Sequence, residues 1–283
     1  MPNLLSSSSW SDAPTTAYRD TLADNQRWST WDSIERLCRG PEPWPDWLVT
    51  AAAAVDTDLG LLKSGKEADV SLLERAVPDD PSRSVVMAAK RYRSTDRRLF
   101  HRDTGYTEGR RIRNSRDTRA VARKSSYGRA VEAGLWARAE WNALVTLYTA
   151  GVPVPYPVQI DGTEILMEFI SDGDAAAPRL HQARPSKPQA ELLFEQLREA
   201  MQAMARLGLV HGDLSPYNTL VSGLDDEPRL VIIDVPQMVD LASNPNAFDF
   251  LHRDCTNMVA WFSHAGLAVD AEDLLAALLS HAW

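Results

Sequence analysis

Apolar residues alternate with polar ones in several short stretches of this chain and recur at helical spacing in longer ones. The alternating stretches predict strands over residues 68–74 and 84–92 and a hairpin formed by 158–160 and 164–170. Helical spacing predicts a helix over 128–150, which the following Gly-Val-Pro-Val-Pro segment ends. Further helices are predicted over 188–207, 246–264 and 270–281.

This order of elements predicts an α+β fold with two lobes. We expect a β-rich N-terminal lobe over residues 55–170, with a loop of low order over 93–127, and a helical C-terminal lobe over 171–283. Residues 1–25, rich in Ser, Thr, Asp and Ala, are expected to form a disordered tail. Residues 26–54 hold several tryptophans among prolines and are expected to pack on the body as an N-terminal extension. Nucleotides commonly bind in the crevice between two such lobes.

Composition excludes several classes of protein. The 283 residues are 44% hydrophobic and 24% charged, as in ordinary globular proteins, and the longest aliphatic stretch, 48–55, is too short to span a bilayer. The N-terminus lacks the pattern of a secretory signal, so a cytoplasmic location is expected. The two cysteines, Cys38 and Cys255, offer no disulfide framework and no Cys-rich zinc site.

Charge is unevenly distributed along the chain. The segment from Arg91 to Arg129 holds twelve Arg, one Lys and four acidic residues, a net charge of +9 in a chain whose total is −9. Arg110, Arg111 and Arg113 are candidate contacts for an anionic partner such as RNA or a ribosomal particle. A solvated loop that only maintains solubility accounts for the same pattern, and both interpretations stay open.

Two short apolar runs each deliver an acidic residue to a strand edge. His211, Asp213 and Asn218 follow the first run, and Asp234 follows the second. Phosphoryl transfer from ATP requires a carboxylate near the attacking hydroxyl, and an Asn and a second carboxylate as magnesium ligands. Asp213 is the candidate base, Asn218 and Asp234 are the candidate ligands, and His211 would brace the loop. The spacing predicts a kinase-type phosphotransferase or ATPase.

The same residue types have a simpler interpretation. Asp and Asn favour turns, so either one alone would be assigned to a turn. Two His-Arg-Asp triplets elsewhere in the chain, ending at Asp103 and Asp254, lack an Asn five residues after the Asp. The complete spacing after His211 therefore favours catalysis over turn formation.

A phosphotransferase of this kind also needs a strand lysine and a helix glutamate that holds it. Lys90 lies in the predicted strand over 84–92, and Glu140 lies in the middle of the predicted helix. An exposed strand lysine and a solvated helix face are the simpler interpretations. The order of these residues along the chain, ahead of Asp213 and Asp234, favours the paired role.

A candidate phosphate-binding element precedes these strands. The segment Gly60-Leu-Leu-Lys-Ser-Gly-Lys-Glu67 differs from a Walker A loop by one residue, because Glu67 replaces the Ser or Thr that binds magnesium. The residues after it predict a strand, whereas a Walker A loop opens a helix. We therefore expect a strand-turn-strand lid in which Ser64, Lys66 and backbone donors face the phosphates.

Five segments are similar to those of one known family. They are Ser64-Gly-Lys-Glu-Ala68, Ala150-Gly-Val-Pro-Val-Pro155, His211-Gly-Asp-Leu-Ser-Pro-Tyr-Asn218, Ile233-Asp-Val-Pro-Gln237 and Phe248-Asp-Phe-Leu-His-Arg-Asp-Cys-Thr-Asn257. Together they resemble the RIO family of atypical serine/threonine protein kinases, in a bacterial-type member. The likeness covers about residues 55–281. Pro216 departs from it, because an acidic residue is expected at that position.

The resemblance implies a bilobal protein-kinase-like fold with a reduced C-terminal lobe that lacks an activation segment and peptide-docking helices. It implies ATP and Mg²⁺ as cofactors, Mn²⁺ as an alternative metal, and a protein substrate. The implied catalytic residues are Lys90, Glu140, Asp213 and Asp234, with Asp234 also a phospho-acceptor during ATP hydrolysis. The implied nucleotide contacts are Ser64, Gly65, Lys66, Glu67, Lys90, Met167, Glu168, Ile170 and Asn218, and the implied metal ligands are Asn218 and Asp234.

Three functions are compatible with the sequence, and we favour a RIO-like kinase or ATPase. A small-molecule phosphotransferase of the aminoglycoside- or choline-kinase kind shares the catalytic spacing, but the 49 residues after Asp234 leave little room for its helical acceptor pocket. The third function is a slow, nucleotide-gated protein that holds RNA or a ribosomal particle through residues 91–129. No contact with a membrane is expected.

Overall fold

The computed structural model describes residues 22–93, 126–236 and 238–282, with side chains from residue 131 onward in the second range. Most of the expected tail (1–25) and of the expected basic loop (93–127) lies outside these residues. Arg110, Arg111 and Arg113 lie outside them too, so their proposed contacts stay a prediction. None of the helices within the described ranges is both long enough and apolar enough to cross a bilayer.

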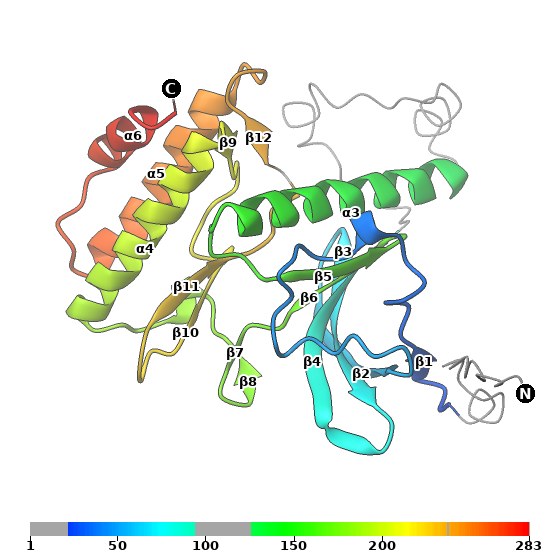
Figure 1. The fold of residues 1–283 in the computed structure, drawn as a ribbon. Coiled ribbons are helices and arrows are strands. Elements are labelled where there is room, and N and C mark those ends of the chain that lie inside the picture. The colour runs from blue at the N-terminus through cyan, green and yellow to red at the C-terminus, as the bar shows by residue number, and fades with distance from the viewer. Residues whose placement is uncertain (1–21, 94–125, 237, 283) are drawn as a thin grey trace, which may run out of the picture.

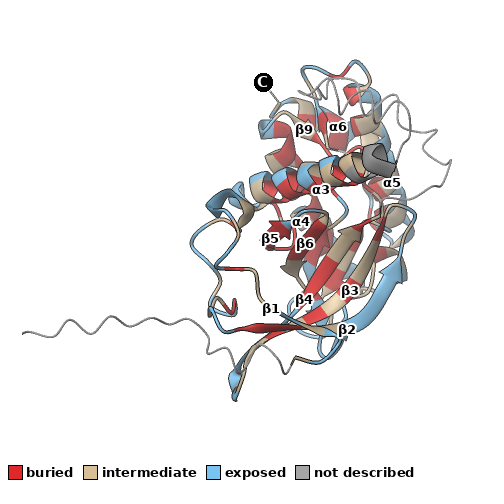
Figure 2. Cartoon of the chain, turned by 90° about the vertical axis from the view of Figure 1, so that its right-hand side faces the viewer, coloured by how far each residue is buried: buried red, intermediate tan, exposed pale blue. Residues whose placement is uncertain are grey.

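A six-stranded antiparallel sheet, crossed by the long helix α3 (Ser126–Thr149), forms the N-terminal lobe (Figure 1). Its strands, in spatial order, are β1 (Gln26–Trp28), β2 (Val55–Ser64), β3 (Ala68–Val77), β4 (Asp80–Tyr92), β6 (Glu164–Glu168) and β5 (Pro157–Asp161). The strands predicted over 68–74 and 84–92 are confirmed and extend further than predicted. The outer half of β2 is exposed (Figure 2), so it has no apolar face to reveal it in the sequence.

The two faces of this sheet pack against different partners. Residues paired directly across neighbouring strands point to the same face. Tyr92 packs with Trp136 and other residues of α3, whereas Leu73 and Met87, on the opposite face, pack with Trp31 of the N-terminal extension. The extension and α3 therefore cover opposite sides of the sheet, and the side that carries Tyr92 also carries Lys90.

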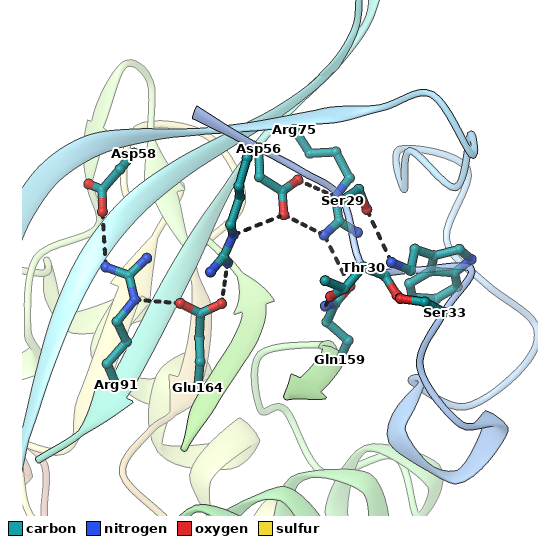
Figure 3. A network of polar contacts seen from close by, with 11 residues as sticks. Ser29, Thr30, Ser33, Asp56, Asp58, Arg75, Arg91, Gln159 and Glu164 are labelled. Carbon is teal, nitrogen blue, oxygen red and sulfur yellow. Dashed lines mark hydrogen bonds and ion pairs between the residues drawn. The ribbon is translucent and has the colours of Figure 1, made fainter. Parts of the chain in front are cut away.

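A buried polar network fastens the extension to the sheet (Figure 3). Arg75 donates to the two carboxylate oxygens of Asp56 at 2.6 and 2.9 Å, and both side chains are almost completely buried. The same Nη2 that donates to Asp56 also donates to Gln159 Oε1 at 3.0 Å, and the Gln159 amide donates to the Thr30 hydroxyl at 2.9 Å. Loss of either Asp56 or Arg75 would leave a buried charge unpaired, which typically costs about 3–5 kcal/mol, so we expect such a variant to destabilise the lobe that presents Lys90.

Helices and short hairpins form the C-terminal lobe (Figure 1). Helix α4 begins where the Ser186 amide donates to the Gln189 side chain at 2.7 Å, and α6 begins where Asp270 accepts from the amides of Glu272 and Asp273. Within the described residues, the helices that follow Asp234 are α5 and α6. The elements are β7 (Ser171–Asp172), β8 (Ala175–Ala176), α4 (Lys187–Arg206), β9 (Leu209–Val210), β10 (Thr219–Ser222), β11 (Arg229–Ile232), β12 (Val239–Asp240), α5 (Ala247–His264) and α6 (Ala271–Leu279), with 3-10 turns η2 (Arg36–Cys38) and η3 (Leu180–Gln182).

Candidate active site

Lys90 joins the two lobes. Its Nζ donates to Glu140 Oε1 at 2.6 Å and to Asp234 Oδ1 at 2.8 Å. Strand β4 supplies the lysine, α3 supplies the glutamate, and Asp234 follows β11 of the other lobe. Burial acts to lower the pKa of Lys90, but the carboxylates of Glu140 and Asp234 outweigh it and raise this pKa. The ammonium group is therefore charged at any physiological pH.

Glu140 is held from a second side. The hydroxyl of Tyr92 donates to Glu140 Oε2 at 2.5 Å, and the glutamate is almost completely buried. Burial and the charge of Glu140 raise the pKa of Tyr92, so its hydroxyl keeps its proton and remains a donor. The hydrogen bonds from Lys90 and Tyr92 satisfy both carboxylate oxygens of Glu140. A glutamate on a solvated face of the helix would not need such partners, because water would supply them.

The loop after β9 places Asp213 and Asn218 together. Asn218 Nδ2 donates to the Asp213 backbone carbonyl at 2.9 Å and to Asp213 Oδ2 at 3.2 Å. The Asp213 amide donates to His211 Nδ1 at 3.2 Å, and His211 Nε2 lies 3.2 Å from the carbonyl oxygen of Ile233. This pattern assigns the proton to Nε2, and burial lowers the pKa of His211, so the ring is a neutral brace between the two loops.

The same contacts bring Asp234 beside this loop. Strands β10 and β11 are paired, and the Ile233 amide donates to the Asn218 carbonyl at 3.0 Å. Asp234 adopts a left-handed backbone conformation with φ of 65°, which turns its side chain out of the strand path. The charge of Lys90, outweighing burial, lowers the pKa of Asp234. An ionised carboxylate with 51% of its side chain exposed thus lies beside Lys90, between the two lobes.

Asp254 on α5 fixes the loop that carries Asp213. Its two carboxylate oxygens accept from the amides of Gly212 at 2.8 Å and Leu214 at 2.9 Å, on either side of Asp213. In the sequence this aspartate belongs to an incomplete His-Arg-Asp triplet that carries no chemical role of its own. Its clamping role depends on a contact between residues some forty positions apart. The signal that could have found it is a carboxylate within an otherwise apolar face of a helix.

Burial raises the pKa of Asp254 to about 7, although the two amides and Arg253 oppose the change. The folded protein therefore binds more protons than the unfolded chain, whose Asp titrates near 4, between those two pH values. The contribution of this group to stability is full below pH 4 and is lost as the pH rises through 7.

We expect the stability advantage of the parent protein over an Asp254→Asn variant to shrink by about 2–3 kcal/mol between pH 5 and pH 8. The neutral Asn removes the titration, while its amide can satisfy only one of the two backbone donors. Urea unfolding of both proteins across this range measures the difference. A gap that is constant with pH would contradict the raised pKa.

The predicted phosphate loop is the tight turn between β2 and β3. The Gly65 amide donates to the Ala68 carbonyl at 2.9 Å, and a Cβ on Gly65 would lie 2.9 Å from the same oxygen, which leaves no room for a side chain. Lys66 is exposed in this turn, and the Glu67 carbonyl accepts from the Arg93 amide at 2.9 Å. A strand, not a helix, follows the turn, as predicted.

Ser64 is not brought to the cluster around Lys90. It pairs with Asp69 of β3, which pairs with Arg91 of β4, so Ser64 lies on the sheet face opposite Lys90. Its hydroxyl accepts a hydrogen bond from Arg93. The Ser64 side chain thus points away from Lys90, and its contact with the phosphates stays a prediction.

The predicted nucleotide contacts Met167, Glu168 and Ile170 also point in different directions. Met167 pairs with Ala88, two residues before Lys90, and thus lies on the cleft face. The side chain of Glu168 instead accepts from the Tyr156 amide at 3.0 Å and lies 3.7 Å from Arg229. Ile170 is buried in a small cluster with Ala177 and Val231. Met167 therefore shares the sheet face of Lys90, whereas Glu168 and Ile170 have other partners, and the nucleotide contacts of all three stay a prediction.

The oxygen donors at the cleft fit a magnesium ion. Asp234 is ionised, and Asn218 uses its Nδ2 for Asp213, which leaves its Oδ1 free to coordinate. Among the described residues no group of three or more His, Cys, Asp and Glu side chains is arranged to hold a metal. A magnesium ion held by Asp234 and Asn218, the predicted ligands, would take its other ligands from water and phosphate oxygens, as is usual for this ion.

Comparison with known proteins gives the same assignment. Residues 83–274 match the RIO domain. The chain is 35% identical over 220 residues to the RIO-type serine/threonine-protein kinase Rio1 of Haloferax volcanii, across 78% of this chain and 68% of that protein. It is 36% identical over 135 residues to serine/threonine-protein kinase RIO1 of Homo sapiens, across 47% of this chain and 23% of that protein.

The fold agrees with a solved member of the same group. The Rio2 kinase of Chaetomium thermophilum, in its ADP/Mg²⁺-phosphoaspartate complex, aligns with a TM-score of 0.55 and 22% identity, across 78% of this chain and 61% of that one. The predicted α+β, kinase-like fold is thereby confirmed. The chain belongs to the RIO family of serine/threonine-protein kinases.

Proposed function

We propose that this chain transfers the terminal phosphoryl group of MgATP to a serine or threonine hydroxyl of a protein. The observation that carries the proposal is the bridge from Lys90 to Glu140 and Asp234, because it assembles groups from both lobes at one point. A lysine held by a helix glutamate contacts nucleotide phosphates in protein kinases. The family and its archaeal relative support the same reaction class.

Asp213 is the group that would orient the acceptor hydroxyl and take up its proton. It is exposed. Asp254 holds its loop by accepting from the amides on either side of Asp213, and Asn218 donates to the Asp213 carboxylate. This fixation reduces the conformational freedom that must be lost when a substrate binds. A bound Mg²⁺ would neutralise charge on the phosphates, and Asn218 and Asp234 would hold it.

ATP hydrolysis through Asp234 is a second candidate function. The exposed, ionised carboxylate could attack the terminal phosphorus with release of ADP, and water would then hydrolyse the acyl phosphate to free phosphate. The phosphoaspartate in the complex of the Rio2 kinase favours this candidate. The two candidates differ in where the phosphoryl group is found after the reaction.

Incubation with ATP labelled in its terminal phosphate separates these functions. We expect acid-stable label on Ser or Thr of the chain itself or of an added protein, and loss of that label in an Asp213→Ala variant. A hydroxylamine-sensitive label, or free phosphate alone, would favour the hydrolytic function. Neither incorporation nor release of phosphate, in a protein that is folded by circular dichroism, would refute both.

A further inference from the structure

Lys63 lies on the same face of the sheet as Lys90. In the strand register, Lys63 of β2 pairs with Val70 of β3, and Val70 pairs with Lys90 of β4. Directly paired residues point to one face, so both lysines lie on the same face of the sheet. Their backbones are about 10 Å apart, because two strand spacings separate β2 from β4. Strand β2 has two register shifts, between Asp58 and Gly60 and between Leu61 and Lys63. If only the second were absent, Lys63 would pair with Asp69 and point to the opposite face.

Arg179 approaches the same place from the other lobe. It precedes η3 and forms an isolated bridge with Leu220, just after the catalytic loop. Its guanidinium donates to the backbone carbonyl of Tyr217, the residue before Asn218. One end of a planar cation is thus anchored on the loop that carries the candidate base and metal ligand, and a guanidinium has further donors.

The positive charge of Arg179 affects the protonation of Lys63. Partial burial and the charge of Arg179 lower the pKa of Lys63, whereas the nearby charge of Asp234 acts to raise it. None of the ion pairs formed among the described residues involves Lys63 or Arg179. Two like charges at such a position repel each other, and an anion between them would convert that repulsion into attraction.

We propose that Lys63 and Arg179 form a two-sided clamp on the terminal phosphate of the bound nucleotide, one cation from each lobe. The proposal rests on the proposed nucleotide site. The terminal phosphate is favoured over an acidic group of the acceptor for two reasons. Lys63 leads directly into the phosphate-loop turn, and it shares the sheet face of Lys90, whose Nζ donates to the candidate metal ligand Asp234. Both side chains are positioning residues that would hold the lobes together in the presence of ATP and release them with ADP.

Binding of two nucleotides tests the clamp. Calorimetry would compare the Mg²⁺ complexes of ADP and of the non-hydrolysable β,γ-imido analogue of ATP, for the parent protein and for Lys63→Gln, Arg179→Gln and the double variant. We expect each single variant to lower the affinity for the ATP analogue about tenfold, equivalent to about 1.4 kcal/mol, and to leave the affinity for ADP unchanged. Since both groups act on one phosphate, the two losses should not multiply in the double variant.

The controls keep charge and folding effects apart. Arg184→Gln removes a neighbouring exposed cation that bonds only to carbonyls around η3 among the described residues, and it should change neither affinity. Lys63→Arg should retain most of the preference for the ATP analogue.

Three results would overturn the clamp while the nucleotide site stands. They are unchanged affinities in all variants, an equal loss for both nucleotides, and a loss seen only in the KM of an acidic acceptor protein. Failure of the parent protein to bind either nucleotide would overturn the proposed function, and the clamp with it.

Discussion

Replacing Asp213 with Ala should lower the rate of phosphoryl transfer by a factor of about 10² to 10⁴ while leaving the affinity for MgATP nearly unchanged. The side chain of Asp213 is exposed and contacts Asn218, whereas the Lys90 bridge is formed by Glu140 and Asp234. Loss of the carboxylate therefore removes the group that takes the proton without removing the groups that hold the phosphates.

Single-turnover transfer from labelled ATP measures the first quantity, and calorimetry measures the second. Asp225→Ala, an exposed acidic residue between β10 and β11, is a matched control that should keep the parent rate. An Asp213→Ala protein that transfers phosphate at the parent rate would rule out a role for Asp213 as base. Parallel loss of nucleotide affinity would instead indicate that the loop had collapsed.

Replacing Asp234 with Ala should remove the dependence of nucleotide binding on magnesium. In the parent protein the affinity for ATP should be at least about tenfold higher with Mg²⁺ than with EDTA, a difference of about 1.4 kcal/mol, and in the variant the two affinities should converge. The physical reason is that Asp234 is the ionised carboxylate among the two candidate ligands, so its loss leaves only the Asn218 amide.

Lys90 provides an internal check on this variant. Its second partner, Glu140, is retained, so the lysine should stay charged and oriented. Metal-independent ATP binding should then survive in Asp234→Ala and be lost in Asp234→Ala combined with Lys90→Met. Equal ATP affinity with and without Mg²⁺ in the parent protein would contradict the metal site itself.

The position of Asp254 adds a consequence for catalysis near neutral pH. Burial raises the pKa of Asp254 to about 7, and its carboxylate accepts from the amides on both sides of Asp213. The geometry of the candidate base is thus coupled to a buried titration on α5. This coupling is distinct from the titration of His211, which burial keeps neutral.

The sequence by itself determined the parts that depend on local pattern. The spacing of His211, Asp213 and Asn218, followed by Asp234, indicated the chemistry. It supplies the carboxylates and the amide that phosphoryl transfer from MgATP needs, each next to a short apolar run. Period-two and helical patterns located β3, β4 and α3. The pairing of Lys90 with Glu140, predicted from their order along the chain, is present in the structure, although their catalytic roles stay a prediction.

Only the tertiary structure decided which side chains share the sheet face of Lys90 and the space beside it. Ser64 was expected there and Lys63 was not, because side chains alternate along a strand and each of the two register shifts in β2 reverses the alternation. The hydrogen bond between Asp254 and the Gly212 amide, and that between Arg179 and the Tyr217 carbonyl, join segments that are far apart in sequence. Periodicity within one segment carries no information about such contacts, since register and long-range packing are set by the fold as a whole.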